Sequence, residues 1–130
     1  MSEDKGRTNY VKVKDPAAFT AEMESLGLEV ITDEKNGETL YGAMTADNDQ
    51  GGWPTQNEQD EDIWIVEVLA KHLVAGEVCV VLSVGSTKMR SLWAAAWAFD
   101  ATGKTVEISL SDIYGKAKET FGKAPGIAEY

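Results

Sequence analysis

Residues 85–88, Gly-Ser-Thr-Lys, have side chains and backbone amides of the kind that bind phosphate. They follow an apolar segment, so a helix over 91–100 would complete a strand, loop and helix like those that cradle nucleotide phosphates. The pattern G-x-x-x-x-G-K-[ST] is incomplete, because a second glycine is missing and Lys88 is followed by Met89. We therefore predict a short polar connection between two strands and no nucleotide cofactor.

Residues 47–58 carry carboxylates at spacings that suit a cation. Counted from the first acid, acids fall at positions 1, 3 and 12 and a glycine at position 6, as in a calcium-binding loop. These four residues are Asp47, Asp49, Glu58 and Gly52. Two other positions do not match, because Gly51 offers no side-chain ligand and Pro54 cannot donate a backbone hydrogen bond. We expect no specific metal site and leave open whether the loop binds a cation.

His72 and Cys79 are the single histidine and the single cysteine of the chain. One histidine excludes a two-histidine metal site or acid–base pair, and we place it on the polar side of a helix, as a surface residue. The apolar segment around Cys79 predicts a buried thiol with a raised pKa, which is a poor nucleophile. We find no assembled catalytic signature and expect a protein that is not an enzyme and uses no cofactor.

The four tryptophans are many for a chain of 130 residues. Trp64, Trp93 and Trp97 lie in apolar segments, where tryptophan fills the space between helix and sheet. Trp53 lies instead in "GGWP", within a polar stretch. It either pins this stretch to the body of the protein or anchors a partner, and pinning is favoured because an exposed tryptophan needs a partner to cover it.

The charge of the chain is uneven. The net charge is −10, with 17 acidic and 6 basic residues in 1–80 but 5 acidic and 6 basic residues in 81–130. The segment 47–67 contains no Lys or Arg, and its acids are Asp47, Asp49, Glu58, Asp60, Glu61, Asp62 and Glu67. Such a field repels phosphate backbones and argues against direct nucleic-acid binding. It attracts a basic protein surface, although acidity also serves solubility.

Hydrophobic periodicity predicts the elements of the first half of the chain. Residues 9–15 alternate as a strand after a polar arm. A helix follows over 15–27, with Asp15 as its N-cap. Asn36-Gly37 then predicts a tight hairpin turn, because both positions tolerate positive φ. Residues 47–62 form a long polar loop, and loops of that length are often functional.

The second half is predicted to continue with a helix over 63–76, although its first residues also suit a strand. A central strand follows over 77–84. The final helix lies over 111–122. Its inward stripe is expected to consist of Ile113, Ala117 and Phe121.

Residues 91–110 fit two structures. As a helix, 91–100 would place Trp93 and Trp97 one turn apart; as a strand, the aromatic side chains share one face and the alanines the other. The segment is short for a helix, and 100–104 suit a hairpin turn with a glycine bulge before a strand over 105–110. We therefore predict a three-stranded meander whose alanine face is shallow enough for a helix to pack against.

The order β-α-β-β-α-β-β-β-α indicates an α+β fold with a mostly antiparallel sheet of five to six strands and three helices. We expect a flexible arm over 1–8, a single domain over 9–122 and a loose tail over 123–130. No segment is apolar enough to span a membrane, and the N-terminus lacks the features of a signal peptide. Together with the single cysteine, this favours a cytoplasmic protein without membrane association.

The acidic loop is the best candidate for a function. We expect a small, non-enzymatic binding protein that contacts a basic surface of a protein partner. The predicted contact residues are Asp47, Asp49, Trp53, Glu58, Asp60, Glu61 and Asp62. One concrete form is an inhibitor of nucleic-acid-handling machinery that imitates phosphate charge, as phages and mobile elements use against host defence. Two alternatives stay open: a small enzyme or ligand-binding domain with a pocket between the sheet and the second helix, and an oligomerising domain that buries Trp93 and Trp97 in a homodimer.

Overall fold

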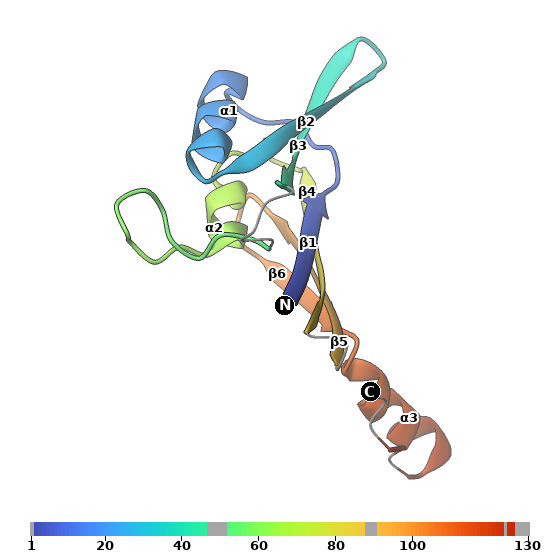
Figure 1. The fold of residues 1–130 in the computed structure, drawn as a ribbon. Helices are drawn as coiled ribbons and strands as arrows, with labels where there is room; N and C mark the ends of the chain where they lie inside the picture. The colour runs from blue at the N-terminus through green and yellow to red at the C-terminus, as the bar shows by residue number, and fades with distance from the viewer. Residues whose placement is uncertain (1, 47–51, 88–90, 124, 127–130) are drawn as a thin grey trace.

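The computed structural model describes residues 2–46, 52–87, 91–123 and 125–126, and it has one six-stranded antiparallel sheet with three helices (Figure 1). The sheet order is β2-β3-β1-β4-β5-β6. The predicted α+β class and element order are confirmed. The elements are β1 (Ser2–Thr8), α1 (Pro16–Ser25), β2 (Leu28–Lys35), β3 (Glu38–Thr45), α2 (Ile65–Ala70), β4 (Val78–Thr87), β5 (Ser91–Asp100), β6 (Thr105–Ser109) and α3 (Asp112–Phe121).

The first strand differs from its predicted position. Residues 2–8, expected as a flexible arm, form β1 in the middle of the sheet, hydrogen-bonded to β3 and to β4. Residues 9–15, expected as the first strand, form no named strand, and their β pairing consists of the isolated bridges of Val11 with Tyr41 and Val13 with Leu73. The sequence "SEDKGRT" has few side chains that favour strands, so β1 depends on backbone pairing with its neighbours. Residues 124 and 127–130 of the predicted tail lie outside the described residues.

The first helix and the hairpin agree with their sequence signals. Asp15 caps α1, and its Oδ1 accepts hydrogen bonds from the backbone N–H groups of Ala17 at 3.1 Å and Ala18 at 3.2 Å. Asn36 and Gly37 connect β2 to β3 with φ angles of 54° and 79°. Both angles are positive, as the predicted two-residue turn requires.

The second helix is shorter than predicted. The helix expected over 63–76 ends at Ala70, because the chain beyond it pairs with residues 11–14. There the backbone N–H of Lys14 donates to the carbonyl oxygen of His72, and Leu73 pairs with Val13. The competing β pairing therefore ends a helix whose apolar pattern continues.

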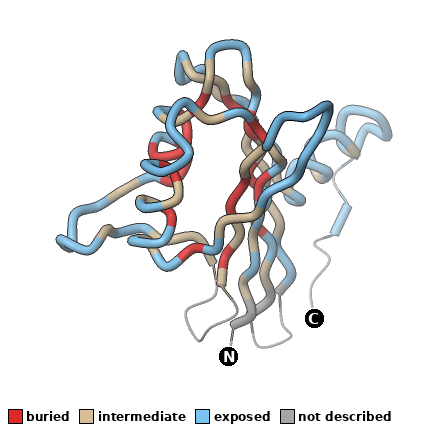
Figure 2. Tube along the Cα trace, turned by 90° about the horizontal axis from the view of Figure 1, so that it is seen from above, coloured by how far each residue is buried: buried red, intermediate tan, exposed pale blue. Residues whose placement is uncertain are grey.

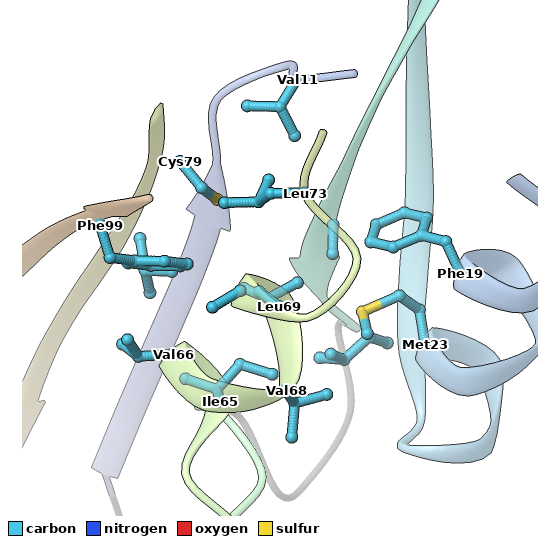
Figure 3. Packing of buried hydrophobic residues seen from close by; sticks show 14 residues of the cluster. Val11, Phe19, Met23, Ile65, Val66, Val68, Leu69, Leu73, Cys79 and Phe99 are labelled. Carbon is cyan, nitrogen blue, oxygen red and sulfur yellow. The ribbon is translucent and has the colours of Figure 1, made fainter. Parts of the chain in front are cut away.

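The predicted β4–β5–β6 meander is confirmed, and residues 85–87 belong to β4 rather than to a phosphate-binding loop. The prediction that a helix packs against the alanine face of β5 is wrong, however. Phe99 is buried, and α2 lies against the face of β5 that carries it, as Figure 3 shows for Val66 and Leu69. The alanine face of β5 is the open one. Aromatic burial outweighs the closer approach that the alanines would allow.

The hydrophobic core lies between the sheet and the two helices α1 and α2 (Figures 2 and 3). Its largest fully buried side chains include Phe19 and Met23 of α1, Leu73, Val81 and Phe99. Within the described ranges, no helix is long and apolar enough to cross a membrane.

The opposite face of the meander is exposed and apolar. Its exposed large side chains are Val78, Leu82, Val84, Leu92, Val106, Ile108 and Leu110. The helix α3 follows β6 and projects from this end of the sheet (Figure 1). None of its described residues is buried, and Ile113 and Phe121 are 60% and 79% exposed. The predicted inward stripe on α3 is therefore wrong for this chain alone.

Candidate functional site

A pocket of about 270 Å³ lies where the uncovered part of the sheet meets the loop before α2. All four tryptophans of the chain contribute to its walls. Trp93 and Trp97 come from β5, Trp53 from the loop and Trp64 from the residue before α2. The remaining lining residues are Asp4, Gly52, Pro54, Thr55, Ile63, Ile65 and Ser83.

Small residues in register on neighbouring strands leave room above the sheet for the ring of Trp53 and, at Ser83, for the pocket. Gly6 of β1 pairs with Ser83 of β4, which pairs with Ala95 of β5. Directly opposite residues of a sheet share a face, so this row offers almost no side-chain volume. Gly85, in the next row, pairs with Trp93. A Cβ atom at Gly85 would lie 2.5 Å from Cε2 of that indole. Glycine at this position therefore lets the ring lie flat against the strand.

Trp53 pins its loop to the sheet, as the sequence favoured. Its Nε1–H donates to the carbonyl oxygen of Leu82 at 3.0 Å, and its ring rests on Gly6. The backbone N–H of Gly52 donates to the carbonyl oxygen of Asp4 at 3.0 Å. Two hydrogen bonds thus join the start of this loop to β1 and β4, while the Trp53 side chain also forms a pocket wall.

Among the described residues that line this pocket, Asp4 is the one with a charged side chain. Its Oδ1 atom is buried, and no other buried side-chain oxygen or nitrogen of the described, non-exposed residues lacks a hydrogen-bond partner. An unpaired buried acceptor costs about 1–3 kcal/mol, and more for a charged group. The pocket is therefore lined by a carboxylate residue, and one oxygen of that carboxylate is buried against Gly85 without a hydrogen-bond partner.

The predicted polar loop contains a small hairpin. The backbone N–H of Ile63 donates to the carbonyl oxygen of Thr55 at 2.9 Å, and Gln56 forms a bridge with Asp62. At the tip, Oδ1 of Asn57 accepts from the backbone N–H groups of residues 59 and 61. The tip is therefore a defined turn, which projects from the body of the protein (Figure 1).

The predicted contact residues fall into two groups. Trp53 lines the pocket, and the exposed side chains of Glu58, Asp60, Glu61 and Asp62 lie at the hairpin tip. These acids are held close together by the turn, directly after the residues that line the pocket. Asp47 and Asp49 lie outside the described residues, and so does most of the candidate calcium loop. Among the described residues, no three His, Cys, Asp or Glu side chains gather as a metal ion would require.

Comparison with known proteins finds no matching family model, no matching curated protein and no matching solved structure.

Cys79 and His72, the two residues considered for catalysis, are too buried for a substrate to contact their side chains readily. Cys79 is 1% exposed, and burial raises the pKa of its thiol to about 12, as the sequence predicted. His72 is not on a helix surface: its side chain is 12% exposed and packs edge-on to the ring of Phe19. Its Nε2 lies 2.6 Å from Oε1 of Glu22.

Glu22 connects α1 to the segment after α2. Its second carboxylate oxygen lies 3.0 Å from Nζ of Lys71, in place of the Glu67–Lys71 pair that helical spacing would allow. Partial burial raises the pKa of Glu22, but the hydrogen bonds from His72 and Lys71 outweigh it and hold the pKa below its usual value of 4.5. Through these two contacts, the Glu22 carboxylate links α1 to the residues that follow α2, which is a structural role.

We expect Glu22→Gln to lower the free energy of unfolding at pH 7 by about 1–2 kcal/mol, because charge-assisted hydrogen bonds are lost. A lowered pKa in the folded state stabilises above the unfolded-state pKa of about 4.5, and this contribution disappears as the pH falls through the folded-state pKa. The difference between the two proteins should therefore shrink below pH 4.5, in urea titrations at pH 7, 5 and 3.5. Exposed Glu24→Gln is the control, and an equal loss in both variants would contradict the assignment.

Two pocket residues, Asp4 and Ser83, cannot be found from the sequence alone. Asp4 lies in the segment predicted as an arm, which offers no partner strand. The small residues Ser83 and Gly85 stand at alternate positions of one strand, which is the available signal for a strand face that lets other groups approach closely. The signal becomes specific only when the register of the three strands is known.

Proposed function

We propose that this protein is a non-enzymatic binding protein that captures a basic segment of a protein partner. The observation that carries the proposal is the position of the four exposed acids of the 58–62 tip, on a hydrogen-bonded hairpin next to a tryptophan-lined pocket. A defined turn presents these charges with little loss of conformational entropy on binding. Charge attracts the partner, and an aromatic pocket beside it supplies desolvated contact area.

An inhibitor of nucleic-acid-handling machinery is a concrete form of this function. A protein that binds nucleic acid has a basic groove spaced for phosphates. The carboxylates of the hairpin tip would occupy such a groove in place of phosphates. Competition between this protein and a DNA or RNA duplex for the same nucleic-acid-binding protein would support this form.

The hairpin acids should dominate binding to a basic peptide. We expect the quadruple variant Glu58→Gln, Asp60→Asn, Glu61→Gln and Asp62→Asn to weaken binding of a fluorescein-labelled peptide of alternating glycine and arginine by at least about tenfold at 50 mM salt. Each replacement keeps the size of the side chain, and asparagine is compatible with the φ of 59° at position 60. Fluorescence anisotropy measures the affinity.

A control of equal charge change separates a local site from a general charge effect. The exposed acids Asp33, Glu34, Glu29 and Glu38 of the β2–β3 hairpin can be replaced by their amides in the same way. Binding should then change less than twofold. Equal weakening by the two quadruple variants would show that net charge alone attracts the peptide and would reject the proposed site.

Self-association is a second candidate function, favoured by the open face of the meander. Its seven exposed side chains are 45–65% exposed and lie on one face of three adjacent strands or directly after β6. An apolar face of this extent is typical of a surface that a partner covers. We propose a second copy of this chain as the occupant. This arrangement differs from the alternative homodimer through Trp93 and Trp97, because both of those side chains line the pocket on the other face.

The distribution of charged residues permits this self-association, although the net charge of the chain is −10. The acidic hairpin is not part of the open face. Lys5 and Arg7 of β1 lie beside that face, because they pair with Val84 and Leu82. Two copies could therefore approach through surfaces that carry little negative charge.

A further inference from the structure

We infer that the tryptophan-lined pocket binds the guanidinium group of an arginine side chain. This inference rests on the proposed function, since the arginine would belong to the basic segment that the hairpin attracts. It names the chemical group of the partner that enters the pocket, which the charge of the hairpin acids alone does not determine.

The charge of the ligand follows from Asp4. An anion would meet a carboxylate inside the pocket and the acids of the hairpin tip outside it. A neutral apolar group would cover the Asp4 carboxylate without supplying a counter-charge or a hydrogen-bond donor. A cation that carries an N–H donor supplies the counter-charge and can form a charge-assisted hydrogen bond with the carboxylate.

The aromatic walls favour a guanidinium over an ammonium group. A lysine ammonium is compact and strongly hydrated, so it loses much of its hydration in an apolar pocket. A guanidinium is planar and weakly hydrated, stacks on aromatic rings and donates in a fork to a carboxylate. Attraction between a cation and an indole extends to about 6 Å from the ring centre, and tryptophan is the best partner. A quaternary ammonium would satisfy the rings but has no donor for Asp4.

The size of the pocket fits one side chain. Its volume of about 270 Å³ lies just below the roughly 300–1,000 Å³ of pockets for drug-sized ligands. The small side chain of Ser83 lies among the lining residues, and Trp64, which also lines the pocket, is 45% exposed. An arginine can enter with its aliphatic chain against the rings and its head group toward Asp4.

The test compares peptides that differ only at one position. The probes are acetyl-Gly-X-Gly-amide with X as arginine, citrulline, lysine or trimethyl-lysine, and citrulline has the shape of arginine without its charge. The binding assays are fluorescence quenching and the shifts of the indole N–H resonances of Trp53, Trp64, Trp93 and Trp97. We expect the arginine peptide to bind at least about tenfold more tightly than the citrulline peptide and more tightly than the lysine peptide.

Two variants assign the binding to this pocket. Asp4→Asn should weaken arginine binding at least about tenfold and leave the protein folded, because the amide has the same shape. Trp64→Leu should weaken it several-fold, and its exposed ring makes little contribution to the fold. The exposed Asp33→Asn is the matched control and should bind like the original protein.

The outcomes separate this inference from the proposed function. Binding of the arginine peptide that is insensitive to Asp4→Asn and Trp64→Leu would overturn the pocket assignment, even if the hairpin acids still capture the longer basic peptide. Tightest binding of trimethyl-lysine would overturn the choice of guanidinium. Pocket binding that persists while the hairpin variants leave capture of the longer peptide unchanged would reject the proposed function and keep the pocket.

Discussion

Gly6→Ala should lower the free energy of unfolding by about 1–3 kcal/mol, as overpacked sites do. In most strands an alanine would be tolerated better than a glycine, which has the larger entropy cost. Here the added Cβ would collide with Nε1 of Trp53 and lie 2.7 Å from the carbonyl oxygen of Leu82. The ring can move, but then its hydrogen bond to that carbonyl is lost and the loop is no longer pinned. Urea titration followed by circular dichroism measures the loss.

The same change at Gly115 provides the control. A Cβ there meets nothing within 4 Å, and the position lies inside α3, where alanine favours the helix by up to about 1 kcal/mol. Gly115→Ala should therefore leave the protein as stable as before or slightly more stable. An unchanged stability of Gly6→Ala, with an unmoved indole N–H resonance of Trp53, would show that the ring does not rest on β1.

A double-mutant cycle distinguishes the two contacts of the new Cβ. If the collision with the ring dominates, Gly6→Ala should cost much less when Trp53 is already alanine. If the approach to the carbonyl oxygen of Leu82 dominates, the cost should be the same in both backgrounds. We expect the first result, with a coupling of about 1 kcal/mol, because a side chain on a loop yields more readily than a strand backbone.

The elements that sequence could predict are those with local signals. Asp15, the turn at Asn36-Gly37 and the glycine bulge after Asp100 each specify backbone geometry through their own chemistry, and the structure agrees with all three. The end of α2 and the position of β1 depend on strand pairing with distant residues. Nothing within "SEDKGRT" indicates that β4 will accept it as a neighbour.

In the candidate site too, some residues have a local signal in the sequence, whereas others are brought together only by strand pairing. The acids of the hairpin tip and Trp53 could be identified, because charge density and an isolated tryptophan are visible in the chain. The pocket could not, since it requires the register that places Asp4 beside Gly85 and Gly85 beside Trp93. Registers of this kind depend on the whole sheet, and a shift by one residue would move every one of these side chains to the other face.

If two copies of the chain associate through the open face of the meander, the measured mass of the particle doubles. This is the largest change that we predict. Light scattering during gel filtration should give about twice the 14.1 kDa of one chain. Ile108 lies on β6 in this face and is 65% exposed. Ile108→Lys should weaken association at least about a hundredfold, because a buried, unpaired charge costs several kcal/mol.

The control adds the same charge to a strand at the other end of the sheet. Thr39 on β3 is exposed, and Thr39→Lys should leave the mass at that of the dimer. If the original protein has the mass of one chain at every concentration up to about 100 μM, a dimer through this face is rejected. If both variants dissociate equally, the association is not assigned to the open face, and this dimer is rejected. Dissociation of Ile108→Lys alone would assign the dimer to this face, and α3 would then have a second chain on which to bury Ile113 and Phe121.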